Sequence, residues 1–201
     1  MAKQIFIIAE AGVNHNGKLD LADAQIGATD AVKAEKLVSV HAPKAEYQKK
    51  SGNAEENQFE MLKKLELGIS EHKAIIARCE EIGIAFLSTP FDPESMEMLK
   101  TLGLSTFKIG SGEITNLPYL RKIASYNLPT ILSTGMSTLE DVEAAVNALT
   151  ASGLSLSKLT LLHCNTQSPT PDEDVNLKAM LTLQKTFPGI AGVGYSDHSE
   201  G

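Results

Sequence analysis

Strand-like runs that end in polar residues alternate along this chain with stretches of helical pattern. The strand-like runs cover residues 5–9, 30–33, 84–87, 106–109, 130–132, 158–163 and 190–194. Helical patterns lie between them, at residues 20–28, 54–67, 70–82, 93–102, 117–126, 138–150 and 174–187. Regular alternation of this kind is typical of parallel strands joined by crossover helices. The sequence therefore predicts an α/β fold.

Local signals set the expected ends of several helices. Ser70 is a suitable N-cap for the helix at 70–82, and Gly83 is a suitable C-terminal stop. Thr138 precedes Leu-Glu-Asp, so a hydroxyl and a following acid predict a capped helix start there. The acidic run 172–174 is expected to be a solvated helix start.

Size and charge exclude several classes of partner. A chain of 201 residues with 42% hydrophobic residues can bury a substantial core, and its length favours a single domain. The net charge of −7 argues against nucleic acid or an anionic membrane as partner. No apolar stretch is long enough to span a bilayer, so a cytoplasmic protein is expected. Cys79 and Cys164 show no metal-binding spacing, and Cys164 is interpreted as a small core residue.

The run from Thr106 to Glu113 carries the strongest sign of a functional site. Its strand delivers Lys108, breaks at two glycines that flank Ser111, and ends on a carboxylate. The glycines allow a positive φ and close backbone approach, so the Ser111 hydroxyl and nearby N–H groups can face a phosphate or carboxylate. Lys108 would add a positive charge beside them.

Polar residues follow nearly every expected strand, and parallel strands place them at one rim. They are Glu10, Lys33, Thr89, Lys108, Ser111, Glu113, Ser133, His163, Asn165, Ser196 and His198. Functional groups gather in this way in a (β/α)₈, or TIM, barrel. The sequence shows about seven strands where that barrel needs eight. We therefore expect a TIM-type barrel domain over residues 1–201, truncated after the seventh strand and belonging to a longer chain.

The motifs, taken in order, resemble the N-acetylneuraminate (sialic acid) synthases and their relatives that make legionaminic or pseudaminic acid. The matching stretches are IIAEAGVNHNG, FLSTPFD, FKIGSGEITNLP, ILSTGMSTLEDV, LLHCNTQSPTPDEDVNL and VGYSDHSEG. The resemblance implies a TIM barrel that condenses phosphoenolpyruvate with an N-acetylated hexose such as N-acetylmannosamine, releasing phosphate. It also implies a divalent ion, Mn²⁺ or Mg²⁺, a homodimer, and a C-terminal antifreeze-like domain that this sequence does not contain.

The resemblance also implies roles for matching positions. The residues expected to hold phosphoenolpyruvate are Lys33, Thr89, Lys108, Ser111, Ser133, Asn165 and Ser196. Glu10 matches a residue that contacts the amino sugar, Asn53 is placed near the sugar, and His198 matches a metal ligand. Glu113 is expected to handle the proton of the attacking water. Gln167-Ser168-Pro169 stands where the family has Tyr-Pro, so an aromatic side chain that would line the sugar pocket is absent and the sugar preference stays open.

Two other functions remain open on the residues alone. Lys108 at a barrel strand end could form a Schiff base, as in an aldolase. A truncated, non-catalytic remnant could instead bind a phosphorylated ligand without turnover. His163 is interpreted as a buried, hydrogen-bonded histidine and not as a metal ligand.

Overall fold

The computed structural model describes residues 5–11, 29–31 and 67–200, with side chains at 5–8 and 67–200. The chain divides into two compact units, Met1–Leu104 and Ser105–Gly201, and each is described by itself. Among the described residues, no helix has the length and apolar character needed to cross a membrane.

In the first unit, two short strands pair in parallel: β1 (Ala9–Ala11) and β2 (Thr29–Ala31). The expected strand at 5–9 begins later than predicted, since residues 5–8 have no regular secondary structure. Ile5 and Ile7 are 82% and 83% exposed. Of the strand predicted at 5–9, only Ala9 is therefore confirmed as part of a strand.

Helix α4 (Ile69–Ile82) follows, and of its two predicted ends only the C-terminal one is confirmed. Gly68, and not Ser70, is the N-cap; the Ser70 hydroxyl donates to Glu71 instead. Gly83 ends the helix as predicted, with a φ of 75° that favours glycine. A small apolar cluster lies under α4, formed by Leu67, Ile75, Cys79, Ile84 and Phe86.

The segment 84–87 contributes side chains to this cluster but forms no strand in the described structure. Helix α5 (Pro93–Thr101) begins after it. Asp92 caps α5 by accepting hydrogen bonds from the Ser95 backbone N–H (2.7 Å) and hydroxyl (2.6 Å). The predicted helix at 93–102 is thereby confirmed, with a Pro at its first position as expected for a helix start.

The second unit alternates strands and helices without exception. Its elements are β3 (Phe107–Ile109), α6 (Leu117–Ser125), β4 (Thr130–Ser133), α7 (Leu139–Ala151), β5 (Leu159–Cys164), α8 (Ala179–Thr186) and β6 (Gly192–Ser196). Three single-turn 3₁₀ helices lie at Ser111–Glu113, Leu156–Lys158 and Asp172–Asp174. The α/β prediction is confirmed.

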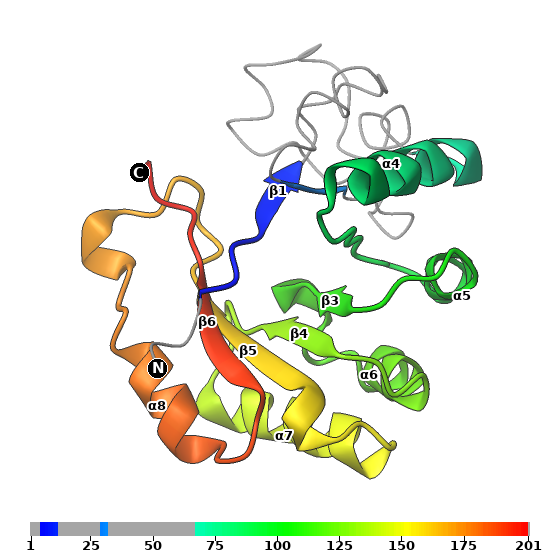
Figure 1. The fold of residues 1–201 in the computed structure, drawn as a ribbon. Coiled ribbons are helices and arrows are strands. Elements are labelled where there is room, and N and C mark those ends of the chain that lie inside the picture. The colour runs from blue at the N-terminus through cyan, green and yellow to red at the C-terminus, as the bar shows by residue number, and fades with distance from the viewer. Residues whose placement is uncertain (1–4, 12–28, 32–66, 201) are drawn as a thin grey trace, which may run out of the picture. The chain divides into compact units, whose positions relative to one another are not determined.

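The four strands of this unit form one parallel sheet in the order β3-β4-β5-β6, so neighbours in sequence are neighbours in space (Figure 1). A doubly wound sheet would reverse its strand order at a switch point, whereas a (β/α)₈ barrel keeps this sequential order. Sequential pairing brings the carboxyl ends of all four strands to one rim of the sheet.

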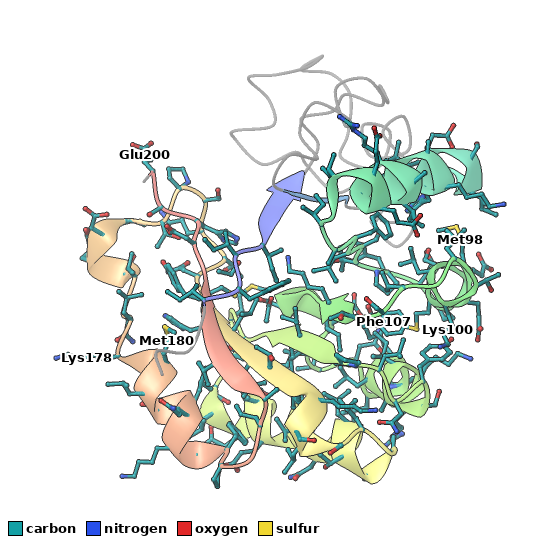
Figure 2. All side chains as sticks on the ribbon, viewed as in Figure 1. Met98, Lys100, Phe107, Lys178, Met180 and Glu200 are labelled. Carbon is teal, nitrogen blue, oxygen red and sulfur yellow. The ribbon has the colours of Figure 1, made fainter. Side chains whose placement is uncertain are left out.

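One face of this sheet is apolar and fully covered. Its large side chains are 0% exposed: Phe107, Ile109, Leu132, Leu159 and Leu161. Phe107, labelled in Figure 2, stacks on Tyr126 at the end of α6, with ring centroids 5.4 Å apart. Helices α6 and α7 lie against each other on the same unit and bury Leu120, Ile123 and Leu149 completely.

Two helices in this unit, α7 and α8, have starts that were predicted from the sequence. Thr138 forms the predicted capping box with Asp141, each side chain bonding the other's backbone N–H. The predicted helix at 174–187 starts later, at Ala179, after the turn at Asp172–Asp174. Asn176 lies in the left-handed region with a φ of 43°, which breaks any continuous helix across it.

Candidate active site

The register of the four-stranded sheet decides which polar side chains share a face. Lys108 of β3 lies beside Ile131 of β4, and Ser133 follows two positions later. Because side chains alternate along a strand, Lys108 and Ser133 point to the same side. Ser133 pairs with Leu162 of β5, and Cys164 follows two positions later and pairs with Ser196 of β6. The side chains of Cys164 and Ser196 therefore point to the same side as well. These four residues define the Lys108 face, opposite the apolar face.

The Lys108 face is partly closed to solvent. Ser133 and Cys164 are 5% and 7% exposed, while Lys108 and Ser196 are half-buried. A charge or hydroxyl in such a place acts through a lower dielectric than in water, which strengthens its interaction with an anion. The face therefore combines one lysine and two hydroxyls in surroundings suited to binding phosphate or carboxylate.

Ser111 lies in the turn after β3 and connects the ends of three strands. The Gly135 backbone N–H, just beyond β4, donates to the Ser111 Oγ at 2.9 Å. The Cys164 Sγ, at the end of β5, lies 3.2 Å from the same oxygen. The Ser111 hydroxyl thus stands at the carboxyl rim of the sheet, as predicted.

The glycines around Ser111 do not use the positive φ that their type allows. Gly110 has a φ of −70°, in extended backbone that any residue can adopt. Gly112 is not among the described glycines with positive φ, because Ser111–Glu113 forms a right-handed 3₁₀ turn. The glycine that matters sterically is Gly135.

Glu113 is held by the start of the next helix. Its Oε2 accepts a hydrogen bond of 2.7 Å from the Asn116 Nδ2. The Asn116 Oδ1 in turn accepts from the Tyr119 backbone N–H (3.3 Å) and caps α6. The Asn116 amide therefore fixes both the start of α6 and the direction of the Glu113 carboxylate. A fixed direction suits a carboxylate that must receive a proton.

His198 and Asn165 tie the loop after β5 to the end of β6. The His198 Nδ1 lies 2.6 Å from the Asn165 carbonyl oxygen, so Nδ1 carries the proton and Nε2 has the free lone pair. The Thr170 N–H donates to the His198 carbonyl at 2.8 Å. The Asn165 Oδ1 accepts from the Gln167 N–H at 2.8 Å, so this oxygen shapes its own loop.

His163 lies on the opposite side of the sheet from the Lys108 face. It is half-buried, its Nε2 lies 2.9 Å from the Val175 carbonyl oxygen, and its ring stacks on Tyr195. The prediction of a hydrogen-bonded histidine is confirmed. Desolvation, followed by the nearby Asp197 carboxylate, raises the pKa of the Tyr195 hydroxyl. The Ser199 backbone N–H, bonded at 2.9 Å, lowers the pKa of Asp197.

Comparison with known proteins places this chain in a family. The sequence profile of the NeuB family matches residues 22–201. The chain belongs to the NeuB family. An N,N'-diacetyllegionaminic acid synthase from Campylobacter jejuni is 50% identical over 209 residues, covering 99% of this chain and 62% of the relative. The synthase of the same name from Legionella pneumophila is 48% identical, covering 98% and 58%.

A relative of known structure has the same fold. The spore coat polysaccharide biosynthesis protein SpsE of Bacillus subtilis superposes with a TM-score of 0.81 at 32% identity. The match covers 100% of this chain and 55% of SpsE. The chain thus spans about three fifths of the length of the curated relatives it matches.

Some predicted site residues of this NeuB-family chain fall in the first unit. Glu10 lies in β1 opposite Asp30, and only its backbone is described. Lys33 and Asn53 lie outside the described residues. Thr89 is 5% exposed in the loop before α5. Their roles stay predictions.

The described residues alone do not make a metal centre. His198 suits one ligand position, because a proton fixed on Nδ1 leaves Nε2 to bind a cation. A metal site needs several such groups, and the described part of the chain holds no cluster of three or more His, Cys, Asp or Glu residues.

Three residues of the site were not predicted from the sequence. They are Cys164, whose sulfur contacts Ser111, Gly135, whose N–H bonds Ser111, and Asn116, which holds Glu113. Asn116 carried a detectable signal, since an asparagine before Leu-Pro is a common helix start. Cys164 and Gly135 carried none, because their contacts join segments far apart in sequence.

Proposed function

We propose that this chain forms the TIM-type barrel of a synthase that condenses phosphoenolpyruvate with an N-acetylated hexose. The products are a nonulosonic, sialic-type acid and inorganic phosphate. The observation that carries the proposal is the Lys108 face, where one lysine and the hydroxyls of Ser133 and Ser196 lie at the carboxyl ends of adjacent strands, beside Ser111.

These groups match the needs of phosphoenolpyruvate. The substrate carries a phosphate and a carboxylate, and anions of this kind require several hydrogen-bond donors and at least one cation. Lys108 supplies the cation, and the serine hydroxyls supply donors. Thr89 and Lys33 would add a hydroxyl and a second charge, and Asn165 an amide. Glu10 and Asn53 would contact the amino sugar.

The residues also suit the chemistry. The enol carbon bonds to the aldehyde carbon of the sugar, and the aldehyde oxygen takes up a proton to become a hydroxyl. Water adds to the carbon that bears phosphate and loses both of its protons, one in exchange for that taken by the aldehyde oxygen and one that leaves with phosphate. The bond between that carbon and the phosphate oxygen breaks, which gives the ketone. Glu113, directed by Asn116, would accept the proton of that water. Enclosure of the Lys108 face would keep bulk water from competing with these contacts.

The relatives support a particular kind of sugar. Two proteins at 50% and 48% identity are named N,N'-diacetyllegionaminic acid synthases. Phosphoenolpyruvate contributes no nitrogen, so both acetamido groups of such a product must come from the sugar. We therefore favour an acceptor with two acetamido groups over N-acetylmannosamine.

Three further expectations stay proposals. A divalent ion, Mn²⁺ or Mg²⁺, would polarise the aldehyde oxygen, and His198 would supply one nitrogen ligand. The full-length protein would be a homodimer, to be checked by sedimentation. A cytoplasmic location is the expectation for an enzyme that uses these small metabolites.

The test is phosphate release by the full-length protein. Phosphoenolpyruvate is supplied with MnCl₂ and either N-acetylmannosamine or a hexose carrying two acetamido groups. We expect release that depends on the sugar and is faster with the diacetamido sugar. Release without sugar, or none with either sugar, would contradict the proposal.

Borohydride trapping separates the aldolase alternative. If Lys108 formed a Schiff base with pyruvate, reduction would add a stable mass to the Lys108 peptide. The synthase predicts no such adduct. Thermal stabilisation by phosphoenolpyruvate without turnover would instead indicate a non-catalytic binding protein.

A further inference from the structure

The thiol of Cys164 takes no part in the function proposed above, yet it lies inside the candidate site. Cys164 ends β5 and pairs with Ser196 of β6, which places its side chain on the Lys108 face. The side chain is 7% exposed. Its sulfur contacts the Ser111 hydroxyl, 53 positions earlier in the chain.

The hydrogen bonds of Ser111 limit what its hydroxyl can do. A serine hydroxyl has one proton and two lone pairs. Gly135 donates its N–H to one lone pair, so Ser111 can only accept at that position. The Cys164 sulfur lies 3.2 Å from the same oxygen, close enough for its S–H to donate to the second lone pair. With both lone pairs occupied in this way, the hydroxyl proton is left to donate to an anionic oxygen of a ligand.

Packing over Gly135 holds the same groups in place. A Cβ at Gly135 would lie 2.9 Å from the Ser111 Oγ, 2.9 Å from the Thr166 Cγ2 and 3.1 Å from the Cys164 Sγ. Contacts under 3.0 Å leave no room for a methyl group. Ser111 and Cys164 therefore both lie close against the glycine Cα, where a larger residue would displace them.

We propose that Cys164 is a positioning residue, which directs the Ser111 hydroxyl toward the anionic group of the substrate. The proposal rests on the proposed function, since it assumes that Ser111 binds phosphate or carboxylate. The Cys164 S–H and the Gly135 N–H donate to the two lone pairs of the Ser111 oxygen, which leaves the hydroxyl proton directed away from both donors. A substrate oxygen accepts that proton on binding, and both donors stay in place.

A double-mutant cycle in the full-length protein tests this coupling. The variants are Cys164→Ala, Ser111→Ala and the double variant, and the readouts are the KM for phosphoenolpyruvate and the rise in Tm caused by phosphoenolpyruvate or inorganic phosphate. We expect Cys164→Ala to raise KM about three- to tenfold, the effect of one misdirected hydrogen bond, with little change in kcat. In the Ser111→Ala background the same change should have almost no effect.

Cys164→Ser provides the matched variant. It keeps a polar partner for Ser111, so it should restore most of the affinity lost in Cys164→Ala. A residue that only fills space predicts instead that both variants bind phosphoenolpyruvate alike, because serine and alanine are both smaller than cysteine and neither fills its place.

The outcomes separate this inference from the proposed function. Equal effects of Cys164→Ala in both backgrounds, or a loss of Tm without a change in ligand affinity, would overturn the positioning role. No stabilisation of the wild type by either ligand would overturn it as well. If phosphoenolpyruvate or phosphate raises the Tm, and the double-mutant cycle shows the expected coupling between Cys164 and Ser111, the positioning role is supported. If no phosphate is released in that case, only the synthase proposal fails.

Discussion

The two faces of the sheet formed by β3 to β6 have opposite characters. The apolar face buries Phe107, Leu132 and Leu161 completely. The Lys108 face, built from alternate residues of the same strands, carries Lys108, Ser133, Cys164 and Ser196. The comparison shows that one set of positions supplies the stability of this unit while the positions between them are available for binding.

This division has an energetic reason. Burial of a large aliphatic or aromatic side chain contributes roughly 1.5–3 kcal/mol, and the apolar face holds several. The Lys108 face contributes less, because partly buried polar groups lose hydration when they leave water. Substitutions on the two faces should therefore separate activity from stability.

The largest effect is expected for Lys108→Ala. Loss of the positive charge should lower kcat/KM for phosphoenolpyruvate by about 10³-fold, since one donor to a buried anion has an effect of this size. The Tm should stay close to wild type. Lys158→Ala is the matched control, because Lys158 bonds the Asn127 carbonyl at the opposite end of the strands. Near-normal kcat/KM in Lys108→Ala would refute the assigned role.

Leu161→Ala should have the opposite pattern. Leu161 is 0% exposed between Leu132 and Val193, so its truncation leaves a cavity. We expect the free energy of unfolding to fall by about 3 kcal/mol, measured by denaturant titration, with kcat per folded molecule retained. The control is Leu181→Ala on α8, where the side chain is 66% exposed. Similar losses in both variants would contradict the assignment of the apolar face.

Asn116→Ser separates two roles of one side chain. Serine keeps the α6 cap through its hydroxyl oxygen but removes the amide N–H that donates to Glu113, and its shorter side chain does not replace it. We expect kcat to fall about tenfold with the KM for phosphoenolpyruvate and the Tm nearly unchanged, since only the direction of Glu113 is lost.

Asn116→Asp sharpens this test. Aspartate also caps α6, but it turns a negative oxygen toward Glu113, so kcat should fall below that of Asn116→Ser. Wild-type kcat in both variants would remove Asn116 from any role in catalysis.

Thr138→Ala should have the smallest effect. It removes half of the capping box at the start of α7 and should lower the free energy of unfolding by about 1 kcal/mol. Hydrogen bonds from Thr138 lower the pKa of Asp141 from its ordinary value of 3.8. This part of the stabilisation is present above pH 3.8 and is lost as the pH falls through the lower folded value.

Thermal unfolding across this pH range measures the effect. The difference in Tm between wild type and Thr138→Ala should shrink below pH 3.8, while kcat at neutral pH stays unchanged. A difference that is the same at every pH would show that Asp141 takes no part in it.

Local signals predicted much of the second unit. The capping box at Thr138, the strand at 130–132 and the helix at 117–126 were all predicted nearly residue for residue. Each depends on neighbours within a few positions. Predictions failed where distant contacts or backbone geometry intervened, as at Asn176, whose left-handed conformation delays α8.

The sequence by itself determined the alternation of strands and helices and the placing of polar residues at strand ends, because both follow from short-range periodicity. Only the tertiary structure decided which of these groups meet. Register placed Lys108 and Ser133 on one face and His163 on the other. Parallel pairing of β3, β4 and β5 brought Gly135 and Cys164 to Ser111 across 24 and 53 positions, and no local pattern encodes contacts at such separations.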